Sequence, residues 1–74
     1  MENEFIGIDS TVCHGKPHIR GTRIPVYLIL ELLEGGNSIN DIAEIIYPEL
    51  TIDQIRAVLR YSSAILKHEE LVLT

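Results

Sequence analysis

The sequence feature that most constrains the fold is an apolar run between a proline and a pair of glycines. Residues 26–33 contain one charged side chain, Glu31, and they lie between Pro25 and Gly35-Gly36. Proline is favoured at the first position of a helix, and glycine is favoured just past its last position. The pattern predicts a helix over residues 25–36 that is apolar on almost every side, and such a helix has to be covered from more than one direction.

The length of the chain limits what can cover this helix. The chain has 74 residues, enough for a single domain, and a domain of this size buries only about 60 % of its unfolded surface. Its one cysteine cannot form an internal disulfide. We therefore expect a homodimer, because a second chain can cover apolar surface that a small body leaves exposed. The candidate dimer interface consists of Val26, Leu28, Ile29, Leu30, Leu32 and Leu33.

Two further helices are marked by their caps. Ser38 and Asp41 have capping-box spacing and predict a helix start, while Tyr47-Pro48 predicts its end, because proline pushes the preceding residue out of the helical region. Thr51 and Gln54 repeat the capping-box spacing at the start of a third helix. The predicted ranges are residues 38–47 and 51–69, followed by a tail over 70–74.

Residues 1–24 are predicted to form an extended arm. Residues 5–8 are typical of a short strand, and residues 18–24 form an extended segment that pairs with it. The predicted fold is mainly α: one domain over residues 1–74, with a tri-helical helix-turn-helix core of the homeodomain-like kind and a short N-terminal β-arm or hairpin. A helical bundle that never touches DNA is the alternative, since fold does not imply function.

The third predicted helix has two distinct sides. Ile52, Ile55, Leu59 and Leu66 recur at helical spacing and are expected to be its buried side. The candidate DNA-binding residues, which recur on another side, are Arg56, Arg60, Ser63 and Lys67. Arginine can read guanine edges, and lysine can contact phosphates. The alternative is a solvated face on which Asp53 pairs with Arg56.

The distribution of charge qualifies this interpretation. The formal net charge is −5, which argues against a surface that is basic throughout. Residues 25–50 contain no Lys or Arg, so all six basic residues lie before or after that stretch. An acidic chain can still present a local basic face.

Neither catalysis nor metal binding is expected. Cys13, His14 and His18 are too few to complete a structural zinc site, which almost always has four ligands, and His68 is far away in the chain. Neighbouring Cys13 and His14 lack a third group that would orient a base toward a nucleophile. We predict no catalytic residue, no metal, no cofactor and no small-molecule substrate.

The arm carries the most distinctive segment. It combines glycines and prolines with three basic side chains, Lys16, Arg20 and Arg23, which are the candidate partner-binding residues. A stiff basic arm could enter a DNA minor groove or bind an acidic protein surface. In the structural alternative, it is a rigid hairpin whose arginines cap the ends of helices. Residues 71–74 are the rival partner-binding surface.

One family has the same signature. The chain resembles domain-of-unknown-function family 433 over Gly15-Lys16-Pro17-x-Ile19-Arg20-Gly21-Thr22-Arg23-Ile24-Pro25-Val26. The resemblance continues through Leu32-Leu33-Glu34-Gly35-Gly36, Tyr47-Pro48-x-Leu50-Thr51 and Asp53-Gln54-Ile55-Arg56-Ala57. His14 departs from the pattern, which has a second glycine at that position of the turn.

The resemblance implies a function in macromolecular binding. It implies a dimeric VapB-like antitoxin that neutralises a PIN-like ribonuclease toxin, whose active site gathers acidic residues, and that represses its own operon. The alternative hypothesis is an adaptor that binds a protein partner and never DNA. The acidic N-terminus and the lack of an apolar run of about 18 residues predict a cytoplasmic protein that does not enter the membrane.

Overall fold

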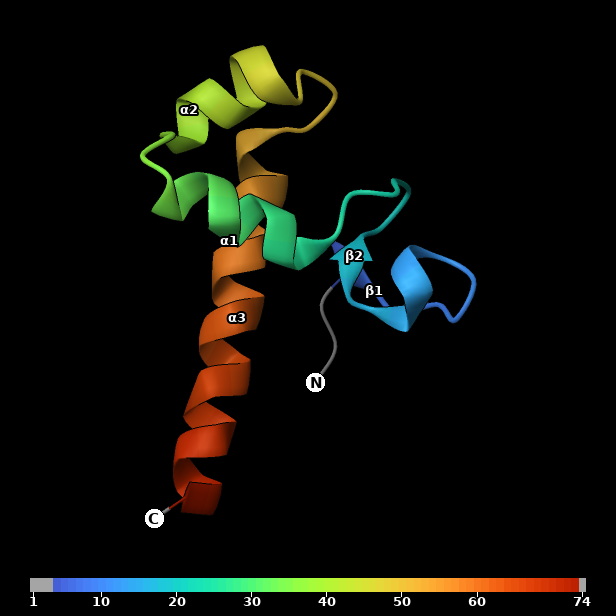
Figure 1. Cartoon of the computed structure of the whole chain (residues 1–74), viewed down its shortest axis with the longest axis vertical. Helices are drawn as coiled ribbons and strands as arrows, with labels where there is room; N and C mark the ends of the chain where they lie inside the picture. The colour runs from blue at the N-terminus through green and yellow to red at the C-terminus, as the bar shows by residue number, and fades with distance from the viewer. Residues whose placement is uncertain (1–3, 74) are drawn as a thin grey trace.

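A computed structural model shows a small helical body with a short hairpin at its side (Figure 1). It describes the backbone of residues 4–73 and the side chains of residues 4–67. The elements in chain order are β1 (Ile6–Gly7), the turn η1 (Cys13–Gly15), β2 (His18–Ile19), α1 (Val26–Glu34), α2 (Ile39–Asp41), η2 (Ile42–Ile46) and α3 (Ile52–Leu73). The prediction of a mainly α, tri-helical helix-turn-helix core with an N-terminal hairpin is confirmed. Among the described residues, no helix combines the length and the hydropathy needed to span a bilayer.

The hairpin is short and is held by backbone hydrogen bonds and buried side chains. β1 and β2 are antiparallel, with Ile6 opposite Ile19 and Gly7 opposite His18. Beyond the strands, the backbone N–H of Arg20 donates to the carbonyl of Phe5 at 2.7 Å, which extends the pairing by one step. Ile6 and Ile19 are both buried, so the hairpin contributes to the core as well as to the arm.

Proline and glycine set the ends of α1, as predicted. Pro25 is still extended and precedes the first helical residue, and Gly36 has a φ of 102° just past the end. Glycine reaches this left-handed conformation without the clash that a Cβ atom would cause. The helix covers Val26–Glu34, slightly less than the predicted 25–36.

The second predicted helix is formed by α2 and η2 together. The Ser38 hydroxyl accepts from the backbone N–H of Asp41 at 3.0 Å, and the Asp41 carboxylate accepts from the N–H of Ser38 at 3.3 Å. The last turn widens to a π-helical one, in which the N–H of Tyr47 donates to the carbonyl of Ile42 at 2.7 Å. The chain leaves the helix at Tyr47, next to Pro48, as expected.

The third helix is longer than the sequence indicates. Its predicted capping box forms, with the N–H of Gln54 donating to the Thr51 hydroxyl at 3.1 Å and the N–H of Thr51 donating to the Gln54 side chain at 2.7 Å. The helix continues to Leu73, so the tail predicted over residues 70–74 is helical as far as Leu73. The side chains of residues 71–74, the rival partner-binding surface, lie outside the described residues.

The core lies where the other elements meet α3. α1, α2 and β1 all contact this helix, which runs behind α1 (Figure 1). The largest fully buried side chains are Ile19, Ile29, Ile42, Ile55 and Val58. α3 is therefore the helix against which α1, α2 and β1 all pack.

The buried side of α3 is not the predicted one. Ile55 is buried as expected, but Ile52, Leu59 and Leu66 are 43 %, 38 % and 64 % exposed. The core side is instead centred on Ile55 and Val58. The prediction failed because helical spacing shows only which residues share a side of α3. Which side is buried depends on the direction from which α1 and the hairpin pack against it.

The prediction that α1 presents six residues to a second chain also needs correction. Val26 and Ile29 are in the core of the chain itself, so their side chains are not available to a partner. Leu30, Leu32 and Leu33 are half-buried and pack against that core, and Leu28 is half-buried. The hairpin, α2 and α3 thus cover most of the apolar helix within one chain.

Candidate binding surfaces on the third helix and the arm

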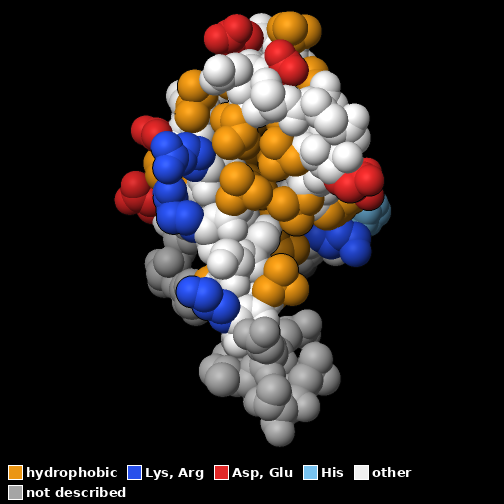
Figure 2. Space-filling model, turned by 90° about the vertical axis from the view of Figure 1, so that its left-hand side faces the viewer, with side chains coloured by type: hydrophobic (Ala, Val, Ile, Leu, Met, Phe, Trp, Pro, Cys, Tyr) orange, Lys and Arg blue, Asp and Glu red, His pale blue; other side chains and the backbone are white. Residues whose placement is uncertain are grey.

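The solvent side of α3 carries the predicted basic face. Arg56, Arg60, Ser63 and Lys67 are all exposed, on the side of the helix away from Ile55 and Val58. Figure 2 shows Lys and Arg side chains in a column down one edge of the molecule. Within the described residues the three basic side chains form no hydrogen bond or ion pair, so the alternative pairing of Asp53 with Arg56 does not occur. The sequence prediction placed these residues on one face correctly.

An acidic region adjoins this face at the start of α3. Its exposed residues are Asp41 on α2, Glu44 on η2, Glu49 in the connection and Asp53 in the first turn of α3. Figure 2 shows Asp and Glu side chains toward the upper end, where α2 lies. These carboxylates repel phosphate, so nucleic acid would contact α3 beyond its first turn.

Arg20 has a structural role. Its Nε donates to the carbonyl of Glu4 at 3.1 Å, and its Nη2 donates to the carbonyl of Ile6 at 2.8 Å. The guanidinium therefore fixes the outer strand of the hairpin. The bonds go to carbonyls in and before β1, whereas the structural alternative expected the arginines to cap helix ends. Contact of Arg20 with a partner stays a prediction.

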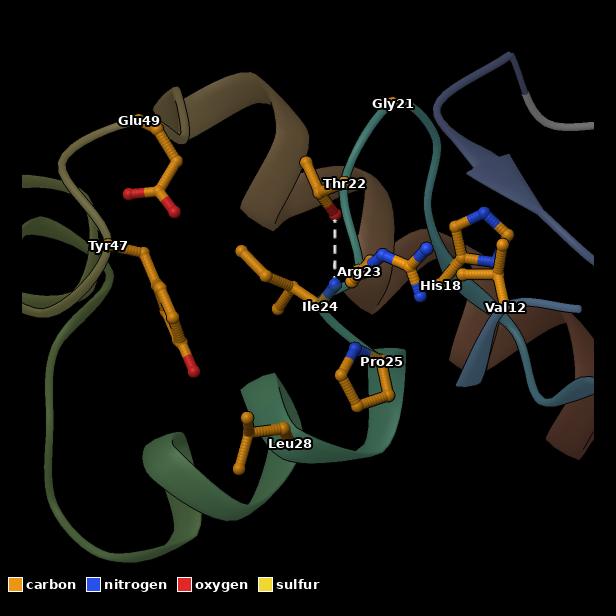
Figure 3. Close-up of a pocket in the computed structure, with 10 residues that line it drawn as sticks. All are labelled: Val12, His18, Gly21, Thr22, Arg23, Ile24, Pro25, Leu28, Tyr47 and Glu49. Atoms are coloured by element: carbon orange, nitrogen blue, oxygen red, sulfur yellow. Dashed lines mark hydrogen bonds between the residues drawn. The ribbon is translucent and has the colours of Figure 1, made fainter. Parts of the chain in front are cut away.

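The other two basic residues of the arm do not converge with Arg20. Arg23 is exposed and lines a cavity of about 780 Å³ between the arm, α1 and the connection into α3. Figure 3 shows its guanidinium reaching toward His18 and Val12, while Tyr47 and Glu49 lie beyond Ile24. Lys16 lines a separate groove, described below. The arm therefore offers separated charges instead of one basic cluster.

His18 is the one buried polar side chain among the described residues. It is 6 % exposed, and its Nδ1 has no hydrogen-bond partner within the described part of the chain. The opposite edge of the ring lies over Gly7, where an added Cβ would come within 3.3 Å of Nε2. A Cβ atom at position 7 would therefore press on the imidazole, which would have to shift by a few tenths of an ångström. This close packing against the hairpin was not visible in the sequence.

Cys13 and His14 lie in a left-handed turn. The φ angles of Cys13, His14 and Gly15 are 52°, 56° and 80°. The Cys13 thiol donates to the carbonyl of Arg23 at 3.3 Å, so it bridges the turn to the end of the arm. His14 is exposed and occupies a left-handed conformation that favours glycine.

Asp9 closes the loop between the strands. The backbone N–H of Thr11 donates to its carboxylate at 2.8 Å, and the Thr11 hydroxyl donates to the same oxygen at 2.7 Å. These hydrogen bonds favour the charged form and lower the pKa of Asp9, with a smaller contribution from His18 and against a small effect of burial. The carboxylate thus stabilises a turn.

A groove that the sequence did not predict lies between α1 and the lower part of α3. Its volume is about 500 Å³, and we call it the α1–α3 groove. The residues that line it are Lys16, Pro17, Val26, Tyr27, Leu30, Tyr61, Ser62, Ile65 and Leu66. The spacing of Tyr61 and Ile65, which are neighbours along a helix, could have indicated this groove. It was missed because Leu66 was assigned to the core.

Comparisons with known proteins support a family assignment. The family model described as "Protein of unknown function (DUF433)" matches residues 6–62. The chain is also similar to the crystal structure of a DUF433 member protein from Anabaena variabilis, with a TM-score of 0.79 and 26 % sequence identity over 97 % of this chain and 71 % of that one. No curated protein matches it.

The matched region includes the hairpin, α1, α2 and the buried part of α3, which are the parts that build the core. It also includes the left-handed turn at Cys13, His14 and Gly15. More than half of the chain is matched, and the chain belongs to the DUF433 family of proteins of unknown function.

Proposed function

We propose that this protein is the antitoxin of a toxin–antitoxin pair, and that it represses its own operon through α3 while a separate surface holds a PIN-like ribonuclease toxin. The observation that carries the proposal is the basic face of α3, where Arg56, Arg60 and Lys67 are exposed and unpaired among the described residues. Unpaired cations on a rigid helix can contact DNA without first breaking an ion pair of their own. Operator binding implies a cytoplasmic protein.

Helix geometry supports contact with DNA along the middle of α3. Arg56, Arg60, Ser63 and Lys67 recur at steps of three or four, so they follow one line on the helix surface. α3 follows α2 and η2 after a short connection, as a recognition helix follows its partner in a helix-turn-helix. Ser63 between the basic residues can donate a hydrogen bond to a phosphate or a base.

Promoter binding tests this half of the proposal. In a retardation assay with the protein's own promoter, Arg56→Ala and Arg60→Ala should each weaken binding by about 1–3 kcal/mol if they read bases. Lys67→Ala should reduce the salt dependence by roughly one unit, as expected for a lost phosphate contact. A promoter fragment that is not retarded at low salt, with or without a protein partner, would contradict it.

Dimerisation is also part of the proposal. Leu28 and Leu32 are half-buried on one flank of α1, and a second copy could cover both. Light scattering should then report about twice 8.3 kDa at micromolar concentration. Leu28→Glu should reduce that mass to the monomer value.

A second candidate function is an adaptor that binds protein and not DNA. The acidic region around Asp41, Glu44, Glu49 and Asp53 favours it, because those carboxylates adjoin the first turn of α3, where recognition helices commonly meet base edges. Co-expression with the adjacent open reading frame separates the two. A nuclease that co-purifies and is neutralised in a growth assay supports the antitoxin; a different co-purifying protein, without DNA retardation, supports the adaptor.

A further inference from the structure

We draw no further inference here: the strongest candidate, the exposed apolar groove between α1 and α3, carries none because nothing in the described part of the chain shows what covers it.

Discussion

α1 and α3 cross at the centre of the molecule, yet their apolar side chains are covered in different ways. α1 has 9 residues, is apolar on almost every side, and is enclosed by the hairpin, α2 and α3. α3 has 22 residues and a distinct polar face, yet it leaves Ile52, Leu59 and Leu66 exposed. Exposure in this fold therefore depends less on how apolar a helix is than on which other elements reach it.

The largest expected effect is the loss of a buried side chain from α1. Ile29 is fully buried, so Ile29→Ala should lower the free energy of unfolding by about 2–5 kcal/mol through lost burial and a cavity. Leu66→Ala on α3 should change it by less than about 0.5 kcal/mol. Urea unfolding of both variants measures the difference; similar losses would show that the exposed side chain is in fact covered.

The next effect concerns Arg20, the arginine that ties the end of β2 to β1 within the hairpin. Arg20→Ala removes two hydrogen bonds to backbone carbonyls, and we expect a loss of about 1–2 kcal/mol in the free energy of unfolding. Arg23→Ala is the matched control, because its side chain has no hydrogen bond within the described residues. Thermal unfolding should lower the Tm for Arg20→Ala alone, and an equal decrease for both variants would contradict the assignment.

A smaller effect on the free energy of unfolding is expected from the N-terminal cap of α3, which α1 lacks. α1 begins after Pro25 without a side-chain cap, whereas α3 begins with the reciprocal hydrogen bonds of Thr51 and Gln54. Thr51→Ala should cost about 1 kcal/mol. Ser63→Ala, in the middle of α3 and without a hydrogen bond within the described residues, should be nearly neutral in urea unfolding. If Ser63→Ala costs as much, the cap is not the cause.

These contrasts also show how far the sequence could predict the structure. Caps and breaks are local: Ser38 with Asp41, Thr51 with Gln54, and Pro48 each act within four residues, and all three were predicted correctly. The basic face of α3 was also predictable, because helical spacing alone puts Arg56, Arg60 and Lys67 together.

The errors involve contacts between distant segments. Leu66 and Ile55 share a helical pattern, but only the approach of α1 determines that one is covered and the other is not. Arg20 has the same charge as Lys16 and Arg23, and only the position of β1 gives it carbonyls to bind. The candidate site was therefore predictable where it depends on one helix and unpredictable where it depends on the hairpin.

The smallest effect is expected at the hairpin loop, on the pH dependence of stability. The folded state lowers the pKa of Asp9 below its ordinary value of 3.8, chiefly through the N–H of Thr11, so the charged carboxylate contributes stability above that pH. This contribution is lost as the pH falls below 3.8 through the lowered pKa. Asp9→Asn should therefore be less stable than the wild type at neutral pH, with the difference shrinking in acid. A difference that stays constant from neutral pH to the acid end would contradict the assignment.

The left-handed turn at Cys13, His14 and Gly15 has a consequence for chirality. Positive φ angles are the ordinary preference of D-amino acids, so three consecutive residues of this chain follow the backbone path of the mirror-image series. A chemically synthesised chain with D-alanine at position 14 should fold at least as readily as the natural one, although the same replacement within α1 would break the helix. We therefore expect this turn to accept a residue of the opposite handedness without strain.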